Sequence, residues 1–431
     1  MRCNWIIKGG RVIDPVSHED NVRDIFIRDG VFSANPPADN YRTVKAKGVL
    51  VCPGLTDLHV HFREPGNIKA ETISSGSLAA AKGGFTNVVT MPNTIPPPDS
   101  PEGIRFQISA ATSTGLVRVI PSGCITAKRQ GRNISDIEGM AKAGAIAFTD
   151  DGSTVSNEAI MKGAMERAQK LGLLIMDHAL DSTLAGRGVM RKGTRAEQLG
   201  FEGIPEDAET RIVERDIKLS MQTGCKMHIQ HISSARSVQL LRDALSRGIP
   251  VSAEATPHHI ALSDTDVDPG NTSYKVNPPL GTKSDVEEII RGLCDNTIKA
   301  FATDHAPHKK EDKEVEFAQA AFGAIGLETA IGVTYKVMAS SGRMRIIDWL
   351  ARWTTGPCSI LGIPCVGFSI GTPADICLID ASNSWTVKSA EFLSHARNCP
   401  FEGWNLPARA ALTMKAGRLT WCESQELLTD G

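Results

Sequence analysis

The sequence predicts an α/β protein in which a (β/α)8 barrel of the TIM type stands beside a small β-sandwich domain formed by both chain ends. From about residue 54, eight short apolar segments alternate with longer helical ones, and eight is the number of strands that closes a parallel barrel. Before and after this region, the pattern changes to short strands separated by turns, with no helical period. The alternation and the similar ends together indicate the two-part architecture.

The two chain ends share a strand-and-turn pattern. Near the N-terminus, NWIIKGGRVIDP and DIFIRDGVFSA alternate apolar runs with Gly or Asp-Gly turn signals. Near the C-terminus, GFSIGTPADICLIDAS and ARAALTMKAGRLTWC resemble them in composition. We therefore expect one β domain made of residues 1–52 and 366–431, and a barrel made of residues 53–365.

The eight expected barrel strands are short apolar segments bounded by turns. They span residues 55–62, 85–93, 116–123, 145–152, 173–179, 226–233, 250–259 and 298–307. Residues 157–172 are an example of the helical segments between them, because this stretch is rich in Ala, Met and Lys and ends at Gly172. Strands that alternate with helices in this way are typical of parallel β-α units.

The composition is that of a globular protein with a large core. Hydrophobic residues make up 41% of the 431 residues and charged residues 22%, so we do not expect disorder. The net charge of -2 gives no basic surface, so we expect neither nucleic acid nor an anionic membrane as a partner. The ten cysteines form no C-x-x-C pair, and no apolar run reaches the length of a signal peptide or a membrane span. These features favour a cytoplasmic protein.

The histidines gather where a barrel carries its active site. Eleven are present, and nine lie in or just after the expected strands: His59, His61, His178, His228, His231, His258, His259, His305 and His308. Most are toward the C-terminal ends of the strands, where barrels of this kind have their active sites. Because imidazoles and carboxylates from several strand ends can ligate one metal centre, the sequence predicts a metal site there.

His59 and His61 are two residues apart on one expected strand. Side chains at positions i and i+2 share a strand face, so both imidazoles can reach one metal ion, and Arg63 continues the same parity. A lone His-x-His pair is about as often a chance feature of an exposed strand. Here Asp57 precedes the pair and histidines recur at other strand ends, so the metal-binding interpretation is favoured.

Two motifs of the barrel region carry a family resemblance: residues 54–66 are GLTDLHVHFREPG and residues 303–308 are TDHAPH. They are similar to the first and second signatures of dihydroorotases, and the chain resembles that family, in particular its long-chain bacterial class within the amidohydrolase superfamily. The likeness continues in order through MPNT (91–94), FTDDG (148–152), MDHA (176–179), QHIS (230–233), EATPHH (254–259), KVNPP (275–279), FGAIGLET (322–329) and RNCPFEGW (397–404). It implies an enzyme that reversibly opens the cyclic amide of (S)-dihydroorotate to N-carbamoyl-L-aspartate in pyrimidine biosynthesis.

The resemblance also implies two zinc ions per subunit. The implied ligands are His59, His61 and Asp304 for one ion, His178 and His231 for the other, and Asp151 as the bridge. Imidazoles and carboxylates are ordinary zinc ligands, and zinc lowers the pKa of a bound water toward about 7. Related amidohydrolases often use a carboxylated lysine as the bridge, whereas this strand end supplies Asp150 and Asp151. Strand parity does not decide between these two, and only the resemblance favours Asp151.

Acid–base and substrate-binding roles follow from the same resemblance. Asp304, beside the metals, would take a proton from the attacking water and pass it to the leaving ring nitrogen. The planar guanidinium of Arg63 suits the ring carboxylate of the substrate. The other implied substrate contacts are Asn93 and His308 beside Arg63, Asn277 and the backbone around Phe322 and Gly323 at the pyrimidine ring, and His61.

Other residues take no such role or depart from the family pattern. We expect His228 to be structural, because strand alternation places it on the opposite face from the metal ligand three residues later. Packing roles are favoured for His258 and His259. Gly281 stands where dihydroorotases usually have Arg, and Ala321 where they usually have Pro, so the loop contacts around these two positions are open.

Two alternative functions deserve comparison. Hydantoinases, dihydropyrimidinases and allantoinases share the barrel and the His-x-His pair, but Arg63 and the aspartate at the bridge favour a dihydroorotase. A non-catalytic paralogue that supports aspartate transcarbamoylase is expected to have lost metal ligands, whereas all six are present here. Besides the small-molecule substrate, we expect a second copy of the chain in a homodimer, with aspartate transcarbamoylase as a further candidate partner.

Overall fold

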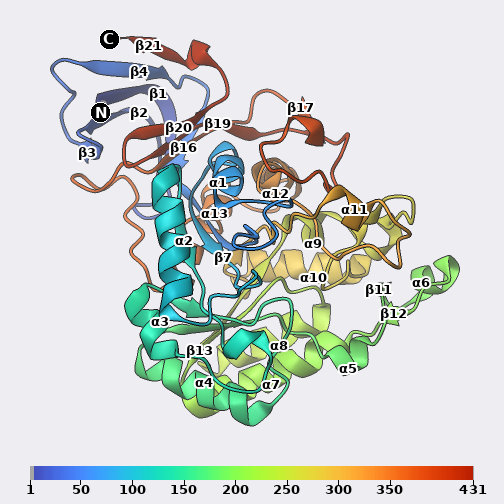
Figure 1. Ribbon diagram of the computed structural model, residues 1–431. Coiled ribbons are helices and arrows are strands. Elements are labelled where there is room, and N and C mark those ends of the chain that lie inside the picture. Colours follow the sequence, from blue (N-terminus) through green and yellow to red (C-terminus); the bar gives the residue numbers. More distant parts are fainter. Residues whose placement is uncertain (1–3, 431) are drawn as a thin grey trace.

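The computed structural model describes residues 4–430, and its centre is a closed barrel of eight parallel strands (Figure 1). The barrel strands are β6 (Leu55–Val60), β7 (Phe85–Thr90), β8 (Arg118–Pro121), β9 (Ala147–Phe148), β10 (Leu174–Asp177), β13 (Lys226–Ile229), β14 (Val251–Ala255) and β15 (Ala300–Phe301). They pair in two arcs, β6-β7-β8 and β9-β10-β13-β14-β15. Backbone bridges from Gly123 to Phe148 and from Val60 to His305 join the arcs. Each of the eight expected segments contains one strand, which confirms the predicted barrel.

Helices follow the strands and cover the outside of the barrel. The principal ones are α1 (Ile73–Lys82), α2 (Pro101–Thr114), α3 (Ile137–Ala143), α4 (Glu158–Lys170), α7 (Asp207–Thr223), α8 (Ala235–Ser246), α10 (Lys283–Cys294) and α14 (Thr355–Leu361). Helix α4 lies within the expected helix 157–172. It begins because the side chain of Asn157 accepts hydrogen bonds from the first free amides, and it stops before Gly172, whose φ of +70° is readily adopted by glycine.

Extra elements enlarge the loops at the C-terminal ends of the strands. Between β10 and α7 lie α5 (Ser182–Ala185), β11 (Met190–Arg191), α6 (Thr194–Leu199) and β12 (Gly203–Ile204), which project from the barrel at the right of Figure 1. After β14 and β15 come α9 (Pro257–Ala261), α11 (Lys310–Lys313), α12 (Ala330–Thr334) and α13 (Ile346–Ala351). None of the helices within residues 4–430 has both the length and the apolar character needed to cross a membrane.

Both ends of the chain enter one nine-stranded sheet beside the barrel. Its strands are β1 (Asn4–Asp14), β2 (Glu19–Arg28), β3 (Val31–Ser33), β4 (Tyr41–Lys45), β5 (Leu50–Pro53), β16 (Ile376–Asp380), β19 (Arg409–Lys415), β20 (Arg418–Cys422) and β21 (Leu428–Asp430). The main order is β20-β19-β16-β5-β1-β2-β3, and β4 pairs with both β1 and β21. In Figure 1 the blue N-terminal strands therefore lie against the red C-terminal strands. A two-stranded pair, β17 (Trp385–Thr386) and β18 (Asn405–Leu406), precedes β19.

The two ends are held together by register and by a shared core. Strand β5 pairs antiparallel with β16, so that Cys52 lies opposite Cys377. Trp5 and Ile7 from the N-terminal part pack with Leu412 from the C-terminal part in one buried cluster. The predicted β domain made from both ends is thus confirmed as an architecture. Residues 1–3 and residue 431 of its expected boundaries lie outside the described residues.

Candidate metal and substrate site

The site begins at the C-terminal end of β6, where three functional side chains follow one another at alternate positions. His59 lies on the strand, and His61 and Arg63 follow it. Asp57 fixes this strand end: its Oδ1 accepts hydrogen bonds from the amides of His59 (3.1 Å) and Thr303 (3.0 Å). Burial raises the pKa of Asp57 to about 7. The tie through Thr303 connects β6 with the segment after β15, and thus brings both strand ends to one place.

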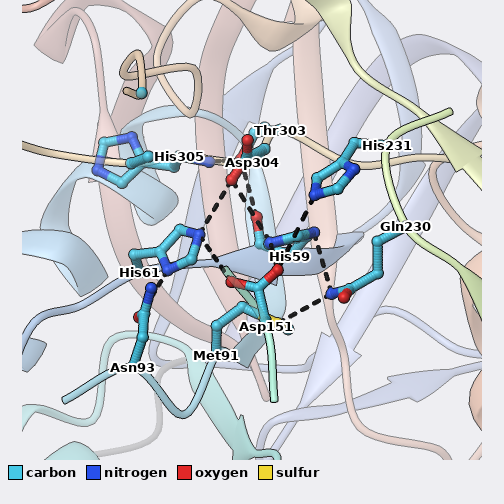
Figure 2. A network of polar contacts seen from close by, with 12 residues as sticks. His59, His61, Met91, Asn93, Asp151, Gln230, His231, Thr303, Asp304 and His305 are labelled. Atoms are coloured by element: carbon cyan, nitrogen blue, oxygen red, sulfur yellow. Dashed lines mark hydrogen bonds and ion pairs between the residues drawn. The ribbon is translucent and has the colours of Figure 1, made fainter. Parts of the chain in front are cut away.

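His59, His61 and Asp151 form the first group of potential metal ligands. Their ligand atoms all lie within 4.8 Å of one another, and all three side chains are buried. Asp304 joins them, because its Oδ1 lies 3.0 Å from His61 Nε2 and 3.4 Å from His59 Nε2. Figure 2 shows Asp304 reaching toward both imidazoles from the opposite side to Asp151. Four side chains from three strand ends therefore converge on one point.

Asp151, His178 and His231 form the second group, again with ligand atoms within 4.8 Å of one another. Asp151 Oδ1 lies 3.2 Å from His59 Nε2, 3.8 Å from His178 Nδ1 and 3.9 Å from His231 Nε2. The same carboxylate thus belongs to both groups. This central place is the one that a bridging ligand requires.

Asp150 lies beside Asp151 in sequence but serves a different purpose. Its Oδ1 accepts hydrogen bonds from the amides of Ile125 (2.9 Å) and Thr126 (3.1 Å), and its Oδ2 accepts from the hydroxyl of Thr126. The carboxylate of Asp150 therefore anchors the loop after β8. Of the two aspartates that the sequence left as alternatives, only Asp151 is directed at the imidazoles.

The donor set fits a metal ion. Burial lowers the pKa values of His61, His178 and His231, so these imidazoles favour the neutral form that binds metals. Burial opposes ionisation of Asp151, but His59 and the other imidazoles outweigh it and hold its pKa well below the usual value. Two buried atoms that face each other at the site make no hydrogen bond within residues 4–430: His59 Nε2 and Asp151 Oδ1, which lie 3.2 Å apart. A cation bound by both would satisfy them.

A cavity of about 240 Å³ opens onto these ligands. Its lining includes every residue that the resemblance assigned to substrate: His61, Arg63, Asn93, Asn277, His308, Phe322 and Gly323. Asp151, His178, His231 and Asp304 line it as well, whereas His59 lies beneath the lining. The predicted metal and substrate residues are therefore brought together around one small, mostly buried space.

Arg63 and Asn93 both line this cavity, and each has a fixed partner. Arg63 Nε donates to the carbonyl of Pro307 at 3.1 Å, and burial lowers the pKa of the guanidinium to about 10, so it remains charged at neutral pH. Asn93 Oδ1 lies 2.8 Å from His61 Nδ1, where it accepts the proton of that nitrogen and leaves His61 Nε2 to face Asp304. Asn93 therefore orients a metal-ligand candidate in addition to lining the cavity.

His308 contacts the loop at residues 321–323. Its Nε2 lies 2.7 Å from the carbonyl oxygen of Phe322, which can only accept a hydrogen bond, so Nε2 carries the proton. Burial lowers the pKa of His308 to about 3, which makes the imidazole neutral and leaves Nδ1 without a proton. In this form His308 holds Phe322, and it would donate to a carboxylate only after changing its tautomer.

Two further side chains fix the same loop, and neither was assigned a role from the sequence, although Asn398 lies in the motif at 397–404. Lys313 Nζ donates to the carbonyls of Ala321 (2.7 Å) and Gly323 (3.0 Å), and burial lowers its pKa to about 7. Asn398 Nδ2 also donates to the carbonyl of Gly323, at 3.0 Å. The departure at Ala321 thus lies within a well-anchored loop.

His258, His259 and the departure from the family pattern at Gly281 are closely surrounded by other parts of the chain. His259 is held between Thr256 Oγ1 (2.8 Å) and the carbonyl of Pro278 (2.9 Å). A side chain at Gly281 would meet the carbonyl of Ser233 at 2.6 Å, so an arginine does not fit there without a shift of the backbone. His258 is buried beside His259.

Two buried polar side chains near the ligands were not singled out from the sequence. Glu254 Oε1 lies 2.8 Å from His59 Nδ1, and Gln230 Nε2 lies 3.3 Å from the same nitrogen. Burial opposes ionisation of Glu254, but hydrogen bonds from His228 and His59 outweigh it and lower its pKa to about 2. A charged residue inside the apolar strand 251–255 was the available signal for Glu254.

Comparison with known proteins places these observations in a family context. A model of the "Dihydro-orotase-like" family matches residues 48–237. The dihydroorotase of Pelotomaculum thermopropionicum is 43% identical over 417 residues, which cover 96% of this chain and 97% of that protein. The dihydroorotase of Halalkalibacterium halodurans is 41% identical over 428 residues, covering 97% and 99%.

Solved structures share the fold at lower identity. An L-hydantoinase (dihydropyrimidinase) from Arthrobacter aurescens superposes with a TM-score of 0.85 at 23% identity, covering 97% of this chain and 96% of that one. A D-hydantoinase (dihydropyrimidinase) from Thermus sp. gives a TM-score of 0.81 at 21% identity, covering 96% and 94%. At these identities the likeness establishes the barrel with its β domain and does not extend to the substrate.

Proposed function

This chain belongs to the dihydroorotase family, and we propose that it catalyses the reversible hydrolysis of the cyclic amide of (S)-dihydroorotate to N-carbamoyl-L-aspartate, a step of pyrimidine biosynthesis. One observation carries the proposal: a single cavity joins the cluster of imidazoles and carboxylates with the guanidinium of Arg63. The cluster suits the hydrolysis of an amide, and the guanidinium suits a substrate that carries a carboxylate.

The proposed cofactor is a pair of zinc ions. The residues that would hold them are His59, His61 and Asp304 for one ion, His178 and His231 for the other, and Asp151 for both. Bound zinc would supply a water of lowered pKa and would polarise the amide carbonyl. The shared position of Asp151 supports a pair of ions over a single one.

We propose that Asp304 carries the proton. Its Oδ1 is directed at His61 and His59, whereas its Oδ2 makes no hydrogen bond within the described residues. A carboxylate oxygen in this place can accept the proton of the attacking water and deliver it to the ring nitrogen as the amide bond breaks. Because Asp304 lines the cavity, the transfer needs no intervening side chain.

Arg63 and Asn93 would bind the ring carboxylate of the substrate, with His308 beside them. The Nε of Arg63 is held by Pro307, so its two terminal nitrogens remain for a carboxylate. Asn277 and the backbone at Phe322 and Gly323 would face the pyrimidine ring. A substrate without the carboxylate would leave a buried guanidinium unpaired. Sites built around a polar group of the substrate discriminate in kcat/KM by about 10^4-fold or more against an analogue that lacks the group.

Further proposals concern the setting of the enzyme. We propose a cytoplasmic homodimer in which residues 1–52 and 366–431 form the β domain and residues 53–365 the catalytic barrel. Nine cysteines within residues 4–430 are free thiols, which supports a reducing compartment. Aspartate transcarbamoylase is a candidate partner, and co-purification or a change in sedimentation on mixing would test it.

The test of the function is a comparison of two substrates on one metal-analysed sample. We expect about two zinc ions per chain and hydrolysis of dihydroorotate at least about 10^4-fold better than hydrolysis of dihydrouracil. Similar rates on the two substrates would assign the chain to a broader cyclic amidase of the hydantoinase kind. Full metal content without turnover of either substrate would indicate a non-catalytic paralogue.

A further inference from the structure

A line of four side chains, three of them fully buried, crosses the barrel interior to His59. Ser252 Oγ lies 2.9 Å from His228 Nδ1, His228 Nε2 lies 3.1 Å from Glu254 Oε2, and Glu254 Oε1 lies 2.8 Å from His59 Nδ1. His228, Glu254 and His59 are each 0% exposed. Ser252 and Glu254 share the inner face of β14, and His228 is the register partner of Ser252 on β13. Strand pairing therefore builds the line.

Glu254 determines which nitrogen of His59 faces the site. A carboxylate can only accept hydrogen bonds, so His59 Nδ1 carries the proton and donates it to Glu254 Oε1. The other neighbour of Nδ1 is the side-chain amide nitrogen of Gln230. The side-chain oxygen of Gln230 accepts a hydrogen bond from Thr149 Oγ1 instead, so Gln230 offers no acceptor to His59 Nδ1. In the neutral imidazole, which is the form that binds a metal, the lone pair of His59 is left on Nε2, 3.2 Å from Asp151 Oδ1.

The same carboxylate reaches the second ligand group. Glu254 Oε1 also accepts a hydrogen bond from the backbone amide of His231, at 3.3 Å. His231 has a φ of +29°, a region that non-glycine residues rarely adopt and that needs support from its surroundings. One residue therefore contacts a ligand of each group.

We propose that Glu254 is a positioning residue of the metal centre, which holds the tautomer and direction of His59 and is itself held by His228 and Ser252. Histidine ligands commonly donate their second N–H to a carboxylate, and loss of that partner weakens metal binding by about 10- to 100-fold. This inference rests on the proposed metal site but adds three residues to it. It also explains why a histidine with no direct path to the metals, His228, occupies the barrel interior.

Zinc affinity of the metal-stripped protein tests the proposal. Wild type, Glu254→Gln, Ser252→Ala and Glu328→Gln are titrated with Zn²⁺ in competition with a chromophoric chelator, and thermal unfolding of each metal-free protein is recorded. Glu328 is the matched control, because it is a buried carboxylate that accepts the amides of Leu393 and Ser394 away from the cavity. We expect Glu254→Gln to weaken binding at one site by about 10- to 100-fold, Ser252→Ala by less, and Glu328→Gln to leave both affinities unchanged.

The outcomes separate this inference from the proposed function. If wild type binds two zinc ions and Glu254→Gln binds both equally well, Glu254 is not a positioning residue and the metal site stands. Equal weakening in Glu328→Gln would attribute the effect to general loss of stability and would also overturn the inference. If wild type binds no zinc, the proposed metal site itself fails. Should Glu254→Gln unfold when stripped of metal, Ser252→Ala decides, and unchanged affinity there would refute the line of contacts.

Discussion

Replacing Arg63 by methionine tests the link between the site and its substrate. Arg63 Nε is bound to Pro307, and the two terminal nitrogens of its guanidinium, which make no hydrogen bond within residues 4–430, lie at the cavity. They can form two charged hydrogen bonds to a carboxylate, each worth about 1.5–3 kcal/mol. Loss of both corresponds to about 3–6 kcal/mol, or about 10^2- to 10^4-fold in kcat/KM. We therefore expect a fall of that size for dihydroorotate.

The assay compares kcat/KM for dihydroorotate and dihydrouracil in wild type, Arg63→Met and Arg63→Lys. Arg63→Met should narrow the difference between the two substrates, because only one of them carries the carboxylate. Arg63→Lys keeps the charge but loses the fork, so an intermediate value is expected. Zinc content is measured in each sample, since Arg63 follows His61 closely and a lost metal would lower activity for another reason. If Arg63→Met kept more than about a tenth of the wild-type kcat/KM with full metal content, the proposed carboxylate site would be wrong.

Three more perturbations address the proton, the metals and pH. Asp304→Asn should lower kcat by about 100-fold or more, and near-normal turnover would remove Asp304 as the proton carrier. His178→Ala and His231→Ala should each reduce bound zinc from about two equivalents to about one, whereas two equivalents by elemental analysis would argue against the second site. Burial lowers the pKa of Lys313 from 10.5 to about 7, so the unfolded chain binds the extra proton between these values and stability rises with pH there. From pH 6 to pH 10 this adds up to about 4 kcal/mol to the free energy of unfolding, and denaturant titrations should find a smaller rise in Lys313→Met. An identical rise in the variant would contradict the lowered pKa.

The sequence predicted the barrel because its strands leave a local signal. Each strand is a short apolar run followed by helix, and the pairing of neighbours follows from the order of the runs. The shared direction of His59 and His61 could also be predicted from local sequence, since their two-residue spacing needs no knowledge of other strands. The β domain was readable for the same reason, although the pairing of β5 with β16 joins segments over 300 residues apart.

Strand alternation did not predict the direction of side chains that lie beyond the ends of short strands. Strand β9 has two residues, and Asp150 and Asp151 lie beyond it, so the turn toward Gly152 and the amides of the β8 loop decide their directions. Strand β13 ends at Ile229, and His231 follows with a φ of +29°, so alternation does not relate it to His228. The contacts of His228 agree with the structural role that was expected for it. The reason given for that role was wrong, because the His228 ring does not face away from the site but points into the barrel interior toward Glu254.

The charge of the site connects these observations. Asp151, Asp304 and Glu254 place three carboxylates within or beside the cavity, and Arg63 is the one permanent cation among the lining residues within 4–430. Three negative charges against one positive charge would repel an anionic substrate in a buried space, where charges are screened little. The two divalent cations proposed for the site would reverse that sign, and neutral imidazoles could hold them without adding charge of their own. This balance of charge supports the proposed roles: the carboxylates would be ligands and supports of cations, and Arg63 would select a substrate with a carboxylate once those cations are bound.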